Sequence, residues 1–423
     1  MPRPTEAANH SRESSRDPSR SVAILGAFSF FLSALEYTFP KPLPFMRLGI
    51  ANLPLLLAVD ILPLPSYFLL ALVKFAGMSL VSGTLFSYIA VFSLAGSLAS
   101  ALAMRGVRFI FRSGVSHLGI SVAGAMASAA SQVLLARWLV FGAAAWAIAP
   151  LFLGASLVTG SLLGVFANRF AANSLWYSGR NPEGSARQPS VGRGDNTGGA
   201  AGSREGRHTS FNWYDSIPPG RLALAGLLVA LALLFQPVLA YKALLVAGLA
   251  LLLGLSGGKI KLFQTLMIII SIIAANLAIP VGRVLTRIGP FAVTETALLE
   301  GFGKALTFEG LIFVSRLALR PGLALPGSVG RAVSDAFAAW RRMTEFVPRF
   351  RPASFVEDAD ALLLRLEVEE HARTVEKDQP PGARTSASGG QRMRVPLGRS
   401  DLAMAAGVAA AITLLVAGRL AAR

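Results

Sequence analysis

The sequence predicts an all-α protein that crosses a membrane many times. Hydrophobic residues make up 53% of the 423 positions, charged residues only 15%, and the mean hydropathy is +0.56. This composition is typical of membrane proteins and nearly excludes a soluble protein. Long apolar stretches recur along the chain, and about 20 helical residues cross a bilayer core of roughly 30 Å. We therefore expect a polytopic bundle of transmembrane helices.

Changes of composition divide the chain into six segments. They are a polar tail (1–20), a six-helix membrane module (21–170, the first block), a linker rich in Gly, Ser, Asn and Arg (171–219), a second membrane module (220–346, the second block), a polar segment (347–400) and a last candidate span (401–423). The tail and the linker hold too few apolar residues to bury, so we expect a disordered tail and a flexible linker. A signal peptide at the start is the competing interpretation, but no small-residue cleavage site follows.

Eleven helical spans are expected in these segments. Six lie in the first block, at Ser21–Phe39, Leu48–Leu62, Ser66–Val81, Ser87–Met104, Leu118–Phe141 and Ala145–Phe170. Four lie in the second block, at Leu222–Phe235, Tyr241–Leu255, Leu262–Ile279 and Ala297–Leu319, and the last is Asp401–Leu420. Because Pro54 interrupts the second span, we expect a broken helix there, which lipid tolerates only where protein covers the freed backbone groups.

Two further elements are expected after the second block. Ser328–Phe346 places five apolar side chains on one helical face, which predicts a helix lying at the membrane interface. These side chains are Val329, Val333, Phe337, Trp340 and Met343. Apolar residues recur at every second position at Leu362, Leu364, Leu366 and Val368, a spacing typical of a strand.

The distribution of positive charge predicts the orientation in the membrane. The net charge is +17, and only seven of the 40 basic residues are lysines. With the N-terminus inside, the inner loops hold clusters such as Arg105, Arg108 and Arg112, whereas the first outer loop holds only Lys41 and Arg47. The positive-inside rule thus predicts a cytoplasmic N-terminus in a bacterial inner membrane. Nucleic-acid binding would need a folded basic domain with interleaved aromatics, which the linker lacks, so no nucleic-acid partner is expected.

The patterns of known catalytic and metal sites are missing from the sequence. The absence of cysteine excludes disulfides, thiolate nucleophiles and cysteine metal sites. There is no Walker A sequence and no DDxxD run, and the four histidines lack the spacing of metal ligands. We therefore expect no catalytic residue, no metal and no cofactor, and interpret the protein as something other than an enzyme.

Ionisable side chains inside spans are the first candidates for function, because burying a charge in a membrane is costly. They are Glu36, Asp60, Lys74 and Arg137. Lys74 lies in the middle of a short span, far from either interface, so we expect a buried partner or an anionic ligand. For the other three the alternative is an interfacial or snorkelling side chain.

Two other patterns indicate binding or close packing. Arg47 and Asn52 bracket a glycine at the start of the broken second span, where arginine donors and freed backbone donors suit an anion, although an ordinary helix start is the alternative. Gly160 and Gly164 form a GxxxG pair, which predicts close helix approach. Gln132, with its neighbour Ser128, is a candidate for lining a substrate site.

On these residues the first block resembles the Gx transporter family, also described as heptaprenyl diphosphate synthase component I. That family is similar to the substrate-binding (S) components of energy-coupling factor transporters. The resemblance covers about residues 21–170 and rests on LGIAN at 48–52, the lysine-bearing third helix and GISVAGAMASAASQ at 119–132. The sequence departs from the family at Pro54 and at Lys74, where the family tends to have an uninterrupted helix and an arginine.

The second block more weakly resembles the transmembrane (T) component of the same transporters, through residues 288–294 and Ser315-Arg316-Leu317. In that family cytoplasmic coupling helices insert into ATPase subunits through Ala-Arg-Gly-like motifs. The motif itself is absent here. Arg341 and Arg342, in the amphipathic helix, are the candidates for that contact.

The resemblance implies uptake of a small solute, vitamin-like or isoprenoid-related. Its partners would be the solute, the lipid bilayer and separate ATPase subunits. Glu36, Arg47 and Asn52 would meet the solute at the outer ends of the first two helices, Lys74 would supply buried positive charge, and Gln132 would line the site. The alternatives are a membrane accessory subunit of a polyprenyl or heptaprenyl diphosphate synthase, and a structural membrane scaffold.

Overall fold

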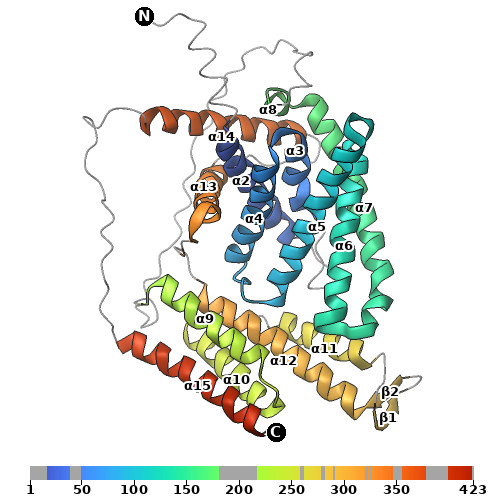
Figure 1. Cartoon of the computed structure of the whole chain (residues 1–423), viewed down its shortest axis with the longest axis vertical. Coiled ribbons are helices and arrows are strands. Elements are labelled where there is room, and N and C mark those ends of the chain that lie inside the picture. The colour runs from blue at the N-terminus through green and yellow to red at the C-terminus, as the bar shows by residue number, and fades with distance from the viewer. Residues whose placement is uncertain are drawn as a thin grey trace, which may run out of the picture.

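Two groups of helices make up the computed structural model (Figure 1). It describes residues 17–38, 49–180, 217–257, 262–277, 282–288, 291–319, 323, 325–345, 355–377 and 399–421. The helices of the first block stand side by side, and those of the second block run across one end of them. The described residues are helical throughout except for turns and one short hairpin, so the all-α prediction is confirmed in outline.

The first block follows the predicted spans closely. Its elements are α2 (Pro18–Thr38), the 3₁₀ helix η1 (Ile50–Asn52), α3 (Leu53–Ile61), α4 (Leu64–Val81), α5 (Tyr88–Phe111), α6 (His117–Ala136), a π-helical turn (Arg137–Phe141) and α7 (Ala145–Asn173). The second span is shorter than predicted, and Pro54 does not interrupt it, because η1 and α3 follow one another directly. Pro54 lies in the first turn of α3, where a proline is tolerated, and nine residues span only about 14 Å, too short to cross a bilayer.

The second block contains four helices and one hairpin in its described part. They are α9 (Pro219–Leu234), α10 (Leu239–Leu255), α11 (Leu262–Leu277), β1 (Val284–Ile288), β2 (Phe291–Thr294) and α12 (Glu295–Ala318). β1 and β2 pair in antiparallel register, an element that the sequence analysis did not predict. The last helix, α15 (Arg399–Ala421), packs beside α9, and the side-chain amide of Gln236 donates to the carbonyl oxygen of Leu414 at 2.9 Å.

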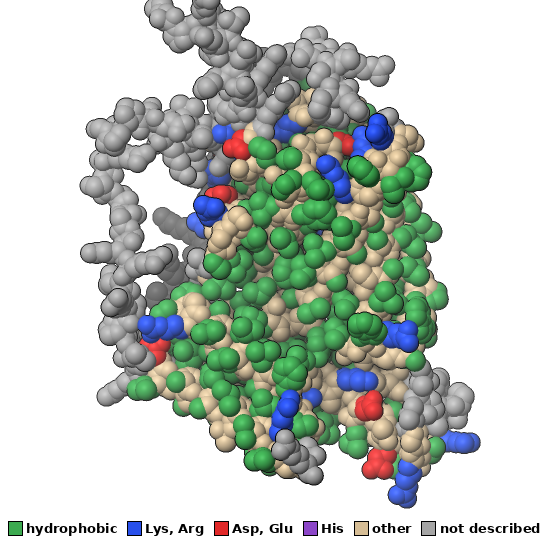
Figure 2. All heavy atoms as spheres, viewed as in Figure 1, with side chains coloured by type: hydrophobic (Ala, Val, Ile, Leu, Met, Phe, Trp, Pro, Cys, Tyr) green, Lys and Arg blue, Asp and Glu red, His purple; other side chains and the backbone are tan. Residues whose placement is uncertain are grey.

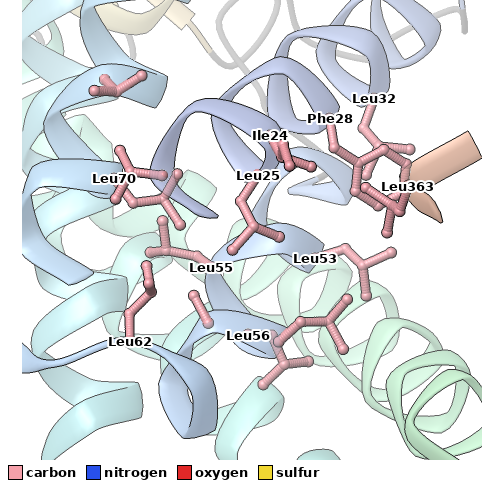
Figure 3. Packing of buried hydrophobic residues seen from close by; sticks show 14 of the residues in the cluster. Ile24, Leu25, Phe28, Leu32, Leu53, Leu55, Leu56, Leu62, Leu70 and Leu363 are labelled. Carbon is pink, nitrogen blue, oxygen red and sulfur yellow. The ribbon is translucent and has the colours of Figure 1, made fainter. Parts of the chain in front are cut away.

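Helix α2 forms the centre of the largest apolar core. Val22, Leu25 and Phe28 are at most 1% exposed. Figure 3 shows side chains of α2 meeting leucines of α3 and α4 on one side and Leu363 on the other. Because α2 is apolar around its whole circumference, it is stable only when it is covered on every side.

Two helices from the C-terminal part of the chain supply the missing cover. They are α13 (Gly327–Glu345) and α14 (Phe355–Lys377). Val333, Ala336 and Met343 of α13 are at most 3% exposed and join the core around α2. The face that the sequence analysis assigned to the membrane interface is therefore covered by α2 and α4.

The strand predicted around residues 362–368 is wrong. This stretch lies within α14, and Leu362, Leu363 and Leu366 are buried against the first block. Their spacing of three and four residues is that of one helical face, and Val368 is 69% exposed. The alternation of leucines misled the prediction because Leu363 belongs to the buried set and Leu364 only packs at its edge.

The beginning of the predicted flexible linker is ordered. A one-turn helix, α8 (Leu175–Ser178), follows α7, and Trp176 is 1% exposed. Asp360 of α14 accepts hydrogen bonds from the hydroxyl of Ser174 and from the backbone amides of Leu175 and Trp176, the last two at 3.0 and 3.1 Å. This carboxylate caps α8 and so ties α14 to the first block. Residues 181–216 of the linker, and 1–16 of the tail, lie outside the described residues.

The second block packs against the turns at one end of the first. The backbone amide of Phe86, between α4 and α5, donates to the hydroxyl of Ser315 at 2.9 Å. Ile268, Phe308 and Ile312 form a shared core with Phe92 and with the residues that join α6 to α7. Figure 2 shows hydrophobic side chains over the middle of one face and charged side chains toward its two ends.

Five segments among the described residues are long and apolar enough to cross a membrane. They are Pro18–Glu36, Leu64–Val81, Tyr88–Phe111, the bent pair His117–Asn173 and Asp401–Ala421. Shorter apolar helices are Ile50–Ile61, Pro219–Leu234, Leu239–Leu255 and Thr265–Leu277. The span expected at Ala297–Leu319 is not among them, because α12 carries charged residues at 300, 304, 309 and 316. The membrane character is thus confirmed, and the number of crossings in each block stays a prediction.

The GxxxG pair brings α6 and α7 into backbone contact. A Cβ added at Gly160 would lie 2.7 Å from Ala125 Cβ, and one at Gly164 would lie 2.5 Å from Leu118 Cα. The hydroxyl of Ser121 donates to the carbonyl oxygen of Gly160 at 2.7 Å. The close approach predicted from sequence is confirmed.

We expect Gly164→Leu to destabilise the first block by about 1–3 kcal/mol, because the added side chain meets backbone that has no room to move. Gly154→Leu is the matched control, since no atom lies within 4 Å of a Cβ added there. Thermal unfolding of the purified protein in detergent would compare the two. Equal losses of Tm would contradict the role of this contact.

Candidate functional site

Three of the predicted binding residues meet at the start of α3. Gly49 adopts a φ of 84°, a conformation that favours glycine and that turns the chain into η1. This turn directs Asn52 toward α4, where its side-chain oxygen accepts a hydrogen bond from Nζ of Lys74. Oε2 of Glu36 accepts a hydrogen bond from the amide of Ala51 at 3.5 Å. Glu36, Asn52 and Lys74 are at most 8% exposed.

A small polar cavity lies beside Asn52 and also contacts Gln132. Serine and threonine side chains of α6 and α7 form the rest of its polar wall, with Ser121, Ser128, Ser156 and Thr159. Nε2 of Gln132 donates to the hydroxyl of Ser128 at 3.0 Å. A second cavity, which is apolar, also contacts Gln132 and has Phe92, Phe141 and Phe152 in its wall. Gln132 therefore separates a polar space from an apolar one.

The cavities are too small for a vitamin-sized molecule. The polar cavity holds about 20 Å³ and the apolar cavity about 10 Å³. One water molecule needs about 10–15 Å³ on this measure, so the polar cavity has room for a single water. Binding of a solute at this place requires α5, α6 and α7 to move apart.

The structure brings together four of the five predicted substrate-binding residues. Glu36, Asn52, Lys74 and Gln132 are linked through η1 and the polar cavity. Arg47 lies outside the described residues. Their role in binding stays a prediction. Arg137, named as a snorkelling residue, places its guanidinium 5.5 Å from the ring centre of Trp146.

A second polar cluster, at the opposite end of α3, was missed as a unit. Oδ1 of Asp60 lies 2.6 Å from Nε of Arg108, and Oδ2 lies 3.1 Å from Nε2 of His117 and 3.0 Å from the hydroxyl of Tyr177. Nδ1 of His117 lies 3.2 Å from Oδ1 of Asn168, which also accepts from the His117 amide. A protonated His117 ring would thus donate at both nitrogens.

The predicted topology could have indicated this cluster. If the chain crosses the membrane back and forth, Asp60, Arg108, His117 and Asn168 all lie on the same side of it, each near one end of its helix. Spacing along the sequence hides this, since the residues come from different helices. Asp60 is 6% exposed in its side chain and is paired, and its position relative to the membrane interface stays a prediction.

The second block contains one buried acid that the sequence analysis overlooked. Glu309 of α12 is 3% exposed, and its Oε2 accepts from the hydroxyl of Thr265 at 3.2 Å. Its Oε1 has no hydrogen-bond partner among the described residues.

The predicted coupling residues differ in exposure. Arg341 is exposed, whereas Arg342 is half-buried and donates to the carbonyl oxygen of Ala338 at 3.1 Å.

The fold and its buried polar residues define a polytopic helical membrane protein with a polar cluster inside its first block. Comparison with protein families matches residues 25–170 to the family described as heptaprenyl diphosphate synthase component I. Residues 221–321 match a domain of unknown function, DUF8519. The chain thus carries a heptaprenyl diphosphate synthase component I family domain followed by a DUF8519 domain, and the family predicted for the first block is confirmed. Searches of curated proteins and of solved structures found no match.

We expect Asp60→Asn to destabilise the protein by about 3 kcal/mol, because it removes the carboxylate that compensates the charge of Arg108. Glu357→Gln is the control, since this exposed carboxylate should contribute within about 0.5 kcal/mol. Thermal unfolding in detergent would measure both. An unchanged Tm for Asp60→Asn would show that the cluster does not stabilise the fold.

Proposed function

We propose that this protein takes up a small solute, with the first block as the substrate-binding module and the second block as a scaffold. The solute would be vitamin-like or isoprenoid-related and would bind among Glu36, Asn52, Lys74 and Gln132. The scaffold would hold the binding module in the membrane and engage separate ATPase subunits. The chain would act in this way as a fused component of an energy-coupling-factor-like transporter.

The observation that supports this proposal most strongly is the buried ammonium group of Lys74. It is 5% exposed and donates to Asn52, which lines the polar cavity. A charge inside a helical membrane protein is costly, and such charges mark solute and ion pathways. The cavity wall, built from hydroxyl and amide side chains, offers donors and acceptors to a polar solute.

Energy coupling would require a contact with ATPase subunits, and in this proposal Arg341 makes that contact. It is exposed on α13, whose opposite face is buried against α2. A load on α13 would therefore be transmitted directly to the first block. In this proposal Arg341 reaches the partner, and Arg342, which is half-buried, stiffens the end of the helix through its bond to Ala338.

We expect Lys74→Ala to lower the amount of co-purified solute at least tenfold while membrane insertion is kept, because a charged hydrogen bond is worth about 1.5–3 kcal/mol. Mass spectrometry of small molecules released from the purified protein would measure this. Arg137→Ala is the control, since its guanidinium stacks on Trp146 away from the polar cavity. Equal retention by Lys74→Ala and the unaltered protein would remove Lys74 from the site.

We expect Arg341→Ala to reduce ATPase subunits that co-purify from membranes, and Arg331→Ala, exposed on the same helix, to leave their amount unchanged. Quantitative mass spectrometry of the purified complexes would compare the variants. If ATPase subunits are recovered but neither variant changes their amount, α13 is not the coupling helix.

A second function is favoured by the name of the matched family, heptaprenyl diphosphate synthase component I. Under this alternative the protein is a membrane accessory subunit of a prenyl diphosphate synthase. The two functions predict different partners. Recovery of a prenyl synthase with an aspartate-rich motif, and of no ATPase, would favour the accessory subunit, as would a neighbouring gene for such an enzyme.

A further inference from the structure

A cavity lies in the second block, away from the residues discussed above. It measures about 530 Å³ and lies between α9, α10 and α12, beside the start of α5. This volume is within the usual range of small-molecule sites, about 300–1,000 Å³. Figure 1 shows these three helices next to one another at the end of the molecule opposite α14.

The wall of this cavity combines hydrocarbon with positive charge. Leu234, Leu239 and Leu299 supply apolar surface, while Lys242 and Lys304 supply two ammonium groups. Glu300 is the one acid in the wall. Its carboxylate is 61% exposed and lies 3.4 Å from Nζ of Lys304. The ionisable groups of the wall therefore carry a net positive charge.

The two lysines differ in their partners. Lys304 donates to Oδ1 of Asn276 at 2.8 Å as well as facing Glu300. Lys242 is half-buried, and within the described part of the chain its ammonium group has no hydrogen bond or ion pair. A half-buried cation without a partner is unfavourable, and an anion bound in the cavity would remove the cost.

We propose that this cavity binds an anionic amphiphile, with a phosphate headgroup at Lys242 and a hydrocarbon chain along the leucines. Lysine is a common phosphate ligand in proteins, as a point charge. This site is independent of the solute site proposed in the first block.

The phosphate could belong to a membrane lipid or to a single-chain phosphate ester, and native mass spectrometry of the full-length protein in a non-ionic detergent would distinguish them. The probes are dioleoylphosphatidylglycerol, dioleoylphosphatidylcholine, dodecyl phosphate, dodecanol and inorganic phosphate. We expect phosphatidylglycerol or dodecyl phosphate to bind at least about tenfold more tightly than its uncharged or zwitterionic counterpart. The tighter binder in competition identifies the source. Equal affinity for charged and uncharged probes would overturn the proposal, and inorganic phosphate binding as tightly as dodecyl phosphate would overturn the role of the chain.

Variants at the cavity test the same site. We expect Lys242→Gln to weaken binding about tenfold and Lys242→Arg to keep it within about threefold. Gly303→Leu should weaken binding without a change of charge, since a Cβ there meets only Leu239, at 3.6 Å, and a longer side chain would fill the cavity. Arg287→Gln, exposed on β1, is the control for general charge effects. Unchanged affinity in Lys242→Gln, or an equal loss in Arg287→Gln, would overturn the proposal.

Discussion

The need to cover α2 on all sides determines how the chain is arranged. Ile24, Leu25 and Ala27 are at most 1% exposed, and they face different directions because successive residues turn by about 100° around a helix. Helices α3 and α4 cover only part of this surface, and α13 and α14, more than 300 positions later in the chain, cover the rest. An apolar helix covered by polar-faced partners is stable next to water as well as in lipid. The C-terminal helices are thus an integral part of the first block rather than an appendage of the second.

This cover ties the two blocks together in spite of the long polar linker. Asp360 caps α8 at the end of the first block, and Arg180 pairs with Glu367 of α14 at 2.5 Å. At the other end, Phe86 and Ser315 join the turn after α4 to α12. The chain therefore runs from the first block through the second, returns to the first with α13 and α14, and comes back to the second with α15. The helices of the second block run across the ends of α4 to α7 (Figure 1).

Sequence patterns predicted most helices because apolar composition and length are local properties. The contact at Gly164 was predictable for the same reason, since the absence of a Cβ acts on neighbouring atoms. The docking of α13 and α14 was not predictable, because an amphipathic face does not say which surface covers it. Lys74 was identified from its cost of burial, but its partner Asn52 depends on the left-handed turn at Gly49. The partners of Asp60 come from three other helices and become neighbours only through tertiary packing.

The two sides of the first block differ in how many buried apolar contacts would be lost if their helices moved apart. On the side of α2, large side chains such as Phe28, Tyr67 and Trp176 are fully buried, and separating them would expose much apolar surface. On the side of α5, α6 and α7, contacts are made by glycine, alanine and serine, and both cavities next to Gln132 lie there. The hydroxyl of Ser100 on α5 is buried without a hydrogen-bond partner among the described residues, so it loses little when that interface opens. A solute that reaches Lys74 and Asn52 would therefore enter by displacing α5 to α7, while α2 and its cover on α13 stay fixed.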